Sequence, residues 1–303
     1  MRILITGASG FVGQAIIKSL SKEITIDVIS RNYSEKHYPV NQILKTYRCL
    51  ETNSGPYNAV IHLAGLAHDT SNQRKETDYF EVNEGITKMV VDWMNKSQKE
   101  ACNLIYLSSI KTYSNNAILN EDCEQKPDSV YGRSKLAAEK YIRENLNTNH
   151  TQYILQPVMI YGEGNKGNLP RLFHMFKKIP FPFKGVKNQR SILSINNLIC
   201  AIEALINNEM ESGKYILCDD KPISTYDMLE SLFVNSPFKL RSFALPEMVI
   251  NLIIKVSSLL KIQVIDKVLG NLVAENTKIK QTIGIQNMPF ETQKELEQLS
   301  VWK

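Results

Sequence analysis

The chain has 303 residues, of which 43% are hydrophobic and 22% charged, with a net charge of +5. These values are typical of an ordinary soluble globular protein that holds one large or two modest domains. The charge forms no basic tract for nucleic acid, and five scattered cysteines without C-x-x-C spacing indicate neither a disulfide framework nor a metal site.

The N-terminal pattern predicts a strand over 2–6, the glycine-rich turn Gly7-Ala8-Ser9-Gly10-Phe11-Val12-Gly13, and a helix over 11–22. The first N–H groups of a helix lack partners and its dipole favours negative charge, so a glycine turn at this place suits a bound anion. The spacing G-x-x-G-x-x-G departs by one residue from the dinucleotide fingerprint G-x-G-x-x-G, and a plain tight connection would give the same pattern. A second strand over 24–30 completes a βαβ unit and favours a pyrophosphate as the ligand.

The second strand ends in Ser30 and Arg31, where an NAD-selective protein usually carries an acid that binds the ribose hydroxyls. An arginine at this place can pair with a 2′-phosphate. The sequence therefore favours NADP over NAD as the cofactor. Stacking of Arg31 on the adenine, or its exposure to solvent, is the alternative.

In the middle of the chain, segments with the apolar pattern of a strand alternate with segments that have the pattern of an amphipathic helix. Strands are expected over 58–64, 103–108 and 152–156, and helices over 84–99 and 130–145. This alternation predicts the α/β class, a doubly wound parallel sheet of the Rossmann type with helices on both faces.

The alternation breaks down after residue 162, where glycine and proline cluster. A helical run at 196–207 and a strand at 214–218 then return to the sheet. We therefore expect two units: a dinucleotide-binding Rossmann domain and a smaller, discontinuous C-terminal substrate lobe. The first would comprise 1–162 with about 191–218, and the second 163–190 and 219–303.

Hydroxyl side chains, including Ser109, follow the strand expected over 103–108, at the sheet edge where parallel sheets bind ligands. In the next expected helix, Tyr131 and Lys135 lie four residues apart and share a face. A phenol is a poor base at neutral pH unless its anion is stabilised, and a nearby ammonium lowers its pKa. A Tyr-x-x-x-Lys pair alone is common on surfaces, but after the glycine turn and the serines it predicts proton transfer.

The segment 245–265 is strongly apolar but is interrupted by Glu247, Lys255 and Lys261. It is too short and too charged for a membrane span, so we expect a helix packed into the C-terminal lobe. A helix lying on a membrane surface is the alternative, which leaves peripheral association open. The apolar start of the chain is broken by glycines and indicates no signal peptide, so a cytoplasmic protein is expected.

The segments TGASGFVG, VIHLAG, YLSSIKTY and YGRSK stand in the order typical of the extended short-chain dehydrogenase/reductases. The chain resembles this family of NAD(P)-dependent nucleotide-sugar epimerases, dehydratases and reductases over nearly its whole length, including QPVMIYGEGNKGNLPRL and RSILSINNL. The resemblance implies a nucleotide-diphosphate sugar as substrate and a homodimer formed through the helices at 84–99 and 130–145.

The resemblance also implies roles for individual residues. Ser109 would hydrogen-bond the reacting sugar oxygen, Tyr131 would move the proton, and Lys135 would hold the nicotinamide ribose while lowering the pKa of the tyrosine. Further cofactor contacts would come from Gly7, Gly10, Phe11, Val12, Gly13, Arg31, Leu63, Ala64 and Gly65. The substrate would meet Asn83, Lys111, Asn168 and Arg190, although Asn83 is equally well explained as a helix cap.

Dehydratases of the family carry an aspartate and a glutamate just after the strand-end hydroxyl, where this chain has Ile110 and Lys111, so we do not expect dehydration. The segments HLAGLAHDT and GNLPRL look most like the reductases of UDP-4-keto-6-deoxy-N-acetylhexosamines, the UDP-N-acetylquinovosamine dehydrogenase type, in surface polysaccharide synthesis. A UDP-sugar 4-epimerase with retained NAD is the alternative. A regulator that senses NADP without turnover is a further alternative, against which Ser109, Tyr131 and Lys135 argue.

Overall fold

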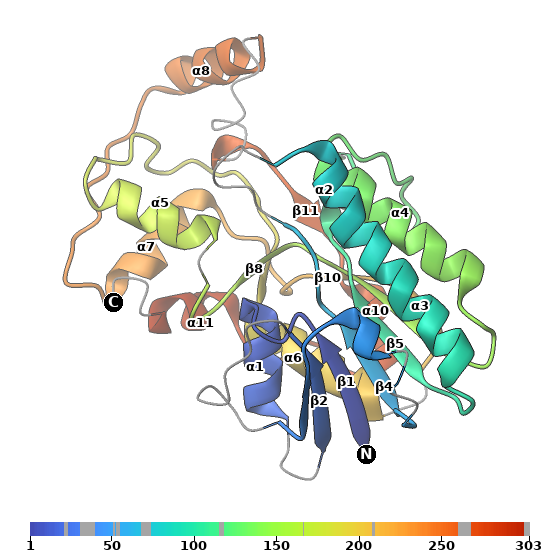
Figure 1. The fold of residues 1–303 in the computed structure, drawn as a ribbon. Coiled ribbons are helices and arrows are strands. Elements are labelled where there is room, and N and C mark those ends of the chain that lie inside the picture. The colour runs from blue at the N-terminus through green and yellow to red at the C-terminus, as the bar shows by residue number, and fades with distance from the viewer. Residues whose placement is uncertain are drawn as a thin grey trace.

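The computed structural model describes residues 1–20, 24–30, 40–50, 52, 55–67, 74–114, 118–165, 167–207, 210–259 and 268–299. Its centre is a seven-stranded parallel sheet in the order β10-β7-β5-β4-β1-β2-β3 (Figure 1). The strands are β1 (Arg2–Thr6), β2 (Thr25–Ile29), β3 (Gln42–Leu44), β4 (Ala59–His62), β5 (Asn103–Leu107), β7 (Thr151–Pro157) and β10 (Gly213–Leu217).

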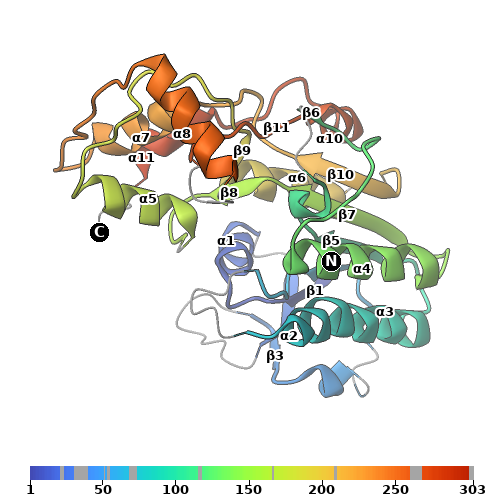
Figure 2. The same cartoon turned by 90° about the horizontal axis from the view of Figure 1, so that it is seen from above.

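Helices cover both faces of this sheet (Figure 2). One face carries α2 (Glu76–Phe80), the π-helical segment η2 (Glu81–Gly85), α3 (Ile86–Ser97) and α4 (Val130–Asn145). The other face carries α1 (Phe11–Ser19), α6 (Ile195–Asn207) and, beside β10 and α6, α10 (Thr277–Ile283).

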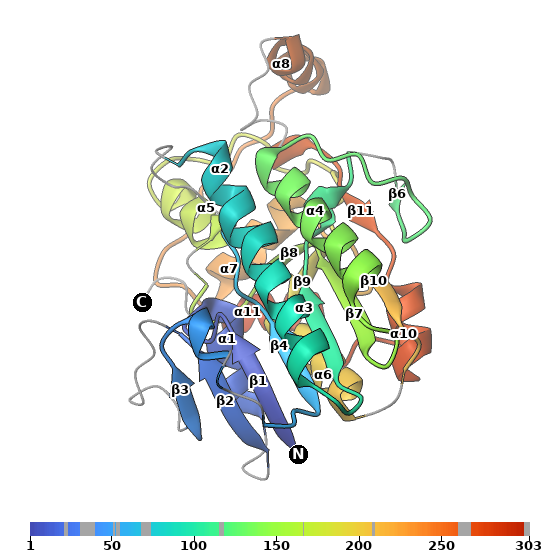
Figure 3. The ribbon, with the colours of Figure 1, turned by 45° about the vertical axis from the view of Figure 1, so that its right-hand side comes forward.

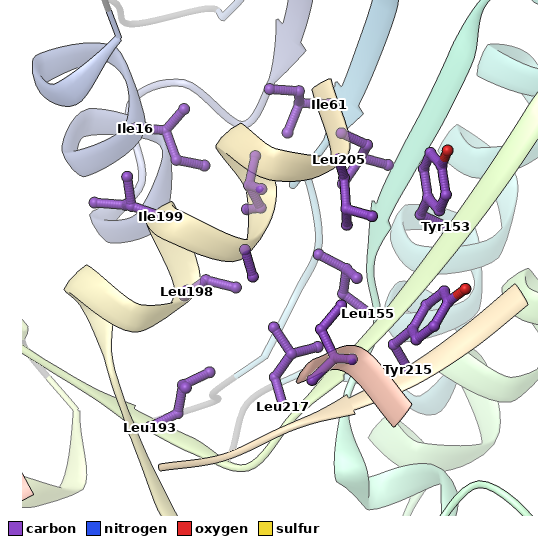
Figure 4. Packing of buried hydrophobic residues seen from close by; sticks show 14 of the residues in the cluster. Ile16, Ile61, Tyr153, Leu155, Leu193, Leu198, Ile199, Leu205, Tyr215 and Leu217 are labelled. Atoms are coloured by element: carbon purple, nitrogen blue, oxygen red, sulfur yellow. The ribbon is translucent and has the colours of Figure 1, made fainter. Parts of the chain in front are cut away.

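Two cores form because successive strand residues point to opposite faces of the sheet. In β1, Ile3 and Ile5 pack on the side of α1 and α6, whereas Leu4 packs on the side of α3 and α4. Figure 4 shows the first core, where Leu198 and Leu205 of α6 approach strand residues of the sheet. These strands are apolar on both faces, as expected for a parallel sheet that is covered on both sides.

A third core lies outside the sheet and is rich in phenylalanine, with Phe173, Phe176 and Phe181 packed against residues from later in the chain. The helices around it are α5 (Asn168–Phe176), α7 (Thr225–Val234) and α11 (Thr292–Gln298). The remaining elements are η1 (Tyr47–Leu50), η3 (Ile110–Thr112), β6 (Ile118–Leu119), β8 (Met159–Tyr161), β9 (Ile192–Ser194), α8 (Glu247–Leu259) and β11 (Val273–Ala274).

The predicted α/β class with a parallel Rossmann-type sheet is confirmed, and the strand over residues 42–44 is an addition that the sequence did not indicate. The helical run expected from residue 84 begins earlier, at Glu76. The apolar segment 245–265 contains α8, and residues 260–267 lie outside the described part of the chain. Within the described residues, no helix has both the length and the apolar character needed to cross a membrane. The division into two domains at the expected boundaries stays a prediction.

Candidate active site

The glycine turn is wedged between β1, α1 and the loop that follows β4. Gly7 has φ +71°, and a Cβ there would lie 2.7 Å from the Ala64 nitrogen. A Cβ on Gly13 would lie 2.5 Å from the Gly7 oxygen. Neither position therefore accepts a side chain. At Gly7 both the left-handed backbone conformation and the close packing exclude one, whereas at Gly13 the packing alone does.

The start of α1 fits an anionic group. Its N-cap is Gly10, which has no side chain to satisfy the first N–H groups, and the first turn contains no acidic residue. Neither the cap nor the first turn of α1 therefore neutralises the positive end of the helix dipole, as a diphosphate site requires. The Phe11 and Val12 side chains turn away to pack against the core on the α1 and α6 side, so these two residues can offer their backbone here.

The loop after β4 is held from both sides. The Leu63 and Ala64 nitrogens donate to the Thr6 backbone oxygen and hydroxyl, each at 3.2 Å. The Leu66 nitrogen donates to Asn83 Oδ1 at 2.6 Å, and Asn83 Nδ2 donates to the Leu66 oxygen at 3.1 Å and to Ser134 Oγ at 2.8 Å.

Asn83 is fully buried, and both of its amide protons are used by these contacts. It lies inside the helical run 76–97 rather than at its start. The helix-cap interpretation of Asn83 is therefore wrong. Its amide positions the loop against α4, and the expected contact with substrate stays a prediction.

Lys135 lies under the same loop. A Cβ on Gly65 would lie 3.1 Å from Asn83 Oδ1 and 3.4 Å from Lys135 Nζ. Lys135 Nζ donates to the Leu107 oxygen at the end of β5 at 2.6 Å and lies 4.4 Å from the centre of the Tyr106 ring. The structure thus brings the ends of β4 and β5 together with α4, as the sequence predicted.

Ser109 and Tyr131 meet because the first turn of α4 rests on η3. Ser109 is the N-cap of η3 and accepts from the Lys111 nitrogen at 3.2 Å, and its hydroxyl lies close enough to Tyr131 to lower the pKa of that phenol. A Cβ on Gly132 would lie only 2.1 Å from the Lys111 oxygen. Gly132 thus permits the close approach that places Tyr131 beside Ser109. Sequence reasoning missed this role, although the glycine directly after the tyrosine was a visible signal.

The electrostatics of the pair differ from the sequence expectation. Burial raises the pKa of Tyr131 to about 12, although the neighbouring Ser109 side chain acts to lower it. Burial lowers the pKa of Lys135 to about 7, and the charge of Glu139 opposes this shift. The expected lowering of the tyrosine pKa by Lys135 is therefore wrong for this structure, because burial outweighs any effect of the ammonium and Lys135 Nζ donates to Leu107 instead.

Glu139 was not predicted and is the centre of a buried hydrogen-bond network one turn after Lys135 on α4. Its carboxylate accepts from Ser108 Oγ, from Gln156 Nε2 at 2.9 Å and from Gln125 Nε2 at 2.8 Å. Its side chain is fully buried and also pairs with Arg143 at 3.3 Å. The i, i+4, i+8 row of Tyr131, Lys135 and Glu139 was the signal in the sequence.

The residues expected to meet the substrate are more scattered. The Lys111 side chain is exposed, and Arg190 is partly buried with Nη1 donating to the Gly270 oxygen at 2.9 Å. Asn168 is the first residue of α5, but its side chain lies outside the described part.

The residues expected to decide between NAD and NADP follow β2. Ser30 is buried at the carboxyl end of this strand, and Arg31 lies outside the described residues. The acid of β2, Asp27, is already engaged: Arg2 Nη2 contacts it at 2.6 Å and the Tyr57 hydroxyl donates to it at 2.7 Å. It is therefore a buried structural carboxylate.

These features define the class of protein: an α/β chain with a Rossmann-type sheet, a glycine turn after β1 and a Ser-Tyr-Lys cluster at the same sheet edge. The model of the NAD dependent epimerase/dehydratase family matches residues 3–218, and the chain belongs to that family.

Named relatives are sugar epimerases. The chain is 27% identical to UDP-glucose 4-epimerase of Vibrio cholerae over an alignment of 303 positions. The alignment covers 93% of this chain and 89% of that protein. It is 27% identical over 227 residues to the N-acetyl-alpha-D-glucosaminyl-diphospho-ditrans,octacis-undecaprenol 4-epimerase of Escherichia coli O157:H7, covering 73% and 67% of the two chains. Its fold is similar to that of UDP-glucuronic acid 4-epimerase from Bacillus cereus in complex with NAD, with a TM-score of 0.75, 17% identity and coverage of 98% and 94%.

Proposed function

We propose that this chain transfers a hydride between a nicotinamide dinucleotide and C4 of a nucleotide-linked sugar. The observation that carries the proposal is the convergence of Ser109, Tyr131 and Lys135 at the sheet edge beside the glycine turn. Loops at the carboxyl ends of parallel strands are where open α/β sheets bind their ligands. The uncapped start of α1 would hold the dinucleotide diphosphate, and Ala64 and Gly65 would pass beside it.

The direction we favour is reduction of a C4 ketone. With a pKa of about 12, Tyr131 holds its proton at neutral pH, which is the protonation state that reduction of a ketone requires. The bound nicotinamide supplies the hydride to C4, and Tyr131 gives its proton to the C4 oxygen, so that the ketone becomes a hydroxyl. Ser109 donates a hydrogen bond to the same oxygen, and Lys135, as an ammonium, would bind the nicotinamide ribose.

We propose NADP as the preferred cofactor and a UDP-4-keto-6-deoxy-N-acetylhexosamine as the substrate. The cofactor choice rests on Ser30 and Arg31 in the sequence, which follow β2 where an NAD-selective protein usually carries an acid. Arg190, Asn168 and Lys111 would contact the substrate diphosphate. We also propose a homodimer through α3 and α4, which lie side by side on one face.

A second candidate function is 4-epimerisation with retained NAD, which the two curated relatives favour. In that reaction Tyr131 would take the proton from the C4 hydroxyl as the hydride leaves C4 for NAD. It would return the proton to the C4 oxygen when the hydride returns to the opposite face of C4. The E. coli relative is named for a lipid-linked diphospho-sugar, so the substrate test includes such a compound.

The experiment has two parts. The purified protein is first denatured and any released dinucleotide is identified. The protein is then incubated with UDP-4-keto-6-deoxy-N-acetylglucosamine and NADPH, and separately with UDP-N-acetylglucosamine and with its polyprenyl-diphosphate analogue, with products identified by NMR. We expect an empty protein that consumes NADPH and the keto sugar. If the protein retains NAD and interconverts C4 epimers, epimerisation is the function and the reductase proposal is wrong. If none of these sugars is turned over, the nucleotide-sugar proposal is wrong.

A further inference from the structure

Helix α8 stands off from the rest of the chain (Figures 1 and 3). Several of its apolar side chains are exposed to solvent. Met248, Leu252 and Val256 are 84%, 60% and 42% exposed. They are spaced by four residues and therefore form one row along the helix. Ile250, on the other side, packs partly against the phenylalanine-rich core. The row of Met248, Leu252 and Val256 is called the α8 face below.

A ribbon of paired backbone leads into this helix and extends the same surface. The Phe181 nitrogen donates to the Arg241 oxygen at 2.7 Å, and the Lys184 nitrogen donates to the Phe243 oxygen at 3.1 Å. This paired ribbon, residues 178–184 with 239–243, exposes Ile179 and Phe243, each about half accessible at 50% and 48%. Of the twelve large hydrophobic side chains that are exposed among the described residues, eight lie between 175 and 179 or between 238 and 256.

The charges around this surface are mostly positive. Exposed cations on the ribbon and on α8 are Lys178, Lys184, Lys239, Arg241 and Lys255. In the sequence, the segments 167–190 and 236–259 contain a single acidic residue, Glu247. The whole chain, by comparison, mixes its charges and has a net charge of only +5. Apolar side chains flanked mainly by cations are the combination that binds an anionic lipid surface.

We propose that the α8 face and the paired ribbon form a docking surface for an anionic lipid bilayer. A second copy of this chain fits less well, because a twofold contact through α8 would bring the same cations against one another. Figure 1 shows the strands rising from the N-terminus towards the side on which α8 projects. Docking through α8 thus turns the edge that carries Ser109 and Tyr131 towards the bilayer. The inference rests on this surface and not on the proposed reaction.

The test is sedimentation of the full-length protein with vesicles. Vesicles of phosphatidylcholine alone are compared with vesicles that contain equal parts of phosphatidylcholine and phosphatidylglycerol, at low and high salt. We expect binding to the anionic vesicles only, and weaker binding at high salt because the ion atmosphere screens the cations. Leu252→Glu should lower the affinity at least about tenfold, and Lys239→Glu about fivefold or more, the scale of one cation at an anionic surface.

Matched controls are Ile118→Glu, an equally drastic change at a side chain that is 51% exposed on β6, and Lys140→Glu on α4. Both should bind vesicles like the unmodified protein, and circular dichroism checks that every variant is folded. The light-scattering mass is measured in parallel. The proposal is overturned if the unmodified protein ignores anionic vesicles, if Ile118→Glu weakens binding as much as Leu252→Glu, or if Leu252→Glu instead splits an oligomer, which would make α8 a contact between copies.

Discussion

Tyr131 is the residue on which the proposed chemistry depends most directly. Its hydroxyl is next to Ser109, and its high pKa keeps it protonated. Tyr131→Phe removes the proton and little volume, so we expect turnover to fall by about 10²-fold or more while cofactor affinity is kept. Steady-state kinetics and cofactor titration measure both. Tyr79→Phe, outside the site, is the control, and turnover that survives in Tyr131→Phe would remove the catalytic role.

Glu139 is expected to keep Lys135 charged. The pKa of Lys135 is about 7 with Glu139 present, and the charge of Glu139 raises it. Glu139→Gln should therefore lower that pKa, so that the ammonium is lost at a more acidic pH. We expect the loss of cofactor affinity with rising pH to move to lower pH by about one unit.

Cofactor binding measured across pH tests the role of Glu139, with Glu144→Gln, an exposed acid of the same helix, as the control. A uniform loss of affinity at all pH values would mean that Glu139 only supports packing.

At the scale of elements, the site depends on how closely α4 approaches η3. The hypothetical Cβ of Gly132, 2.1 Å from the Lys111 oxygen, must push these two elements apart. Gly132→Ala should leave the protein folded but lower turnover by about 10²-fold, because Tyr131 and Ser109 lose their alignment. Gly85→Ala is the matched control, since its Cβ would meet nothing closer than 3.8 Å. Equal activity of the two variants would contradict this explanation of the site geometry.

His62 links three elements and makes stability depend on pH. It contacts the Thr6 hydroxyl at 2.6 Å and the Thr87 hydroxyl at 2.9 Å, and burial lowers its pKa to about 3, aided by the charge of Lys135. Between about pH 6.5 and 3 the unfolded chain binds a proton here that the folded chain does not. The free energy of unfolding should therefore fall by about 1.4 kcal/mol per unit as pH drops through this range.

Denaturant unfolding at a series of pH values checks the sign. His62→Gln should be less stable near neutral pH, because it loses both threonine contacts, but should show a shallower decline on acidification. His174→Gln, at an exposed histidine of α5, should keep the full slope. If His62→Gln and the unmodified protein decline in parallel, another group is responsible.

The sheet and the identity of the cluster could be predicted from the sequence, because apolar periodicity and the spacing of Tyr131 and Lys135 are local signals. The contacts between distant segments could not. No local sequence pattern indicates that Gly132 contacts Lys111 or that Asn83 hydrogen-bonds Leu66. The same holds for the hydrogen bonds of Gln156 and Gln125 to Glu139. The prediction of a lowered pKa for Tyr131 was wrong for the same reason, since burial is a property of the assembled fold.

At the scale of the whole molecule, the proposed roles divide between the sheet and the region around the phenylalanine-rich core. The sheet edge holds the proton-transfer residues, whereas Arg190 and α5 belong to the part that would hold the substrate. The same part carries the α8 face. In the proposed arrangement, substrate recognition and membrane docking would share one side of the molecule, and the chemistry would take place at the sheet edge.

The central claim is hydride transfer at sugar C4, and the most direct measurement follows the hydrogen itself. The protein is incubated with UDP-4-keto-6-deoxy-N-acetylglucosamine and NADPH that carries deuterium at the transferable position of the nicotinamide, and the product is examined by NMR. The account predicts deuterium at C4 of the sugar and none elsewhere, with the label lost from the cofactor in equal amount. Deuterium at another carbon, or a cofactor that keeps all its label while the ketone stays unreduced, would contradict it.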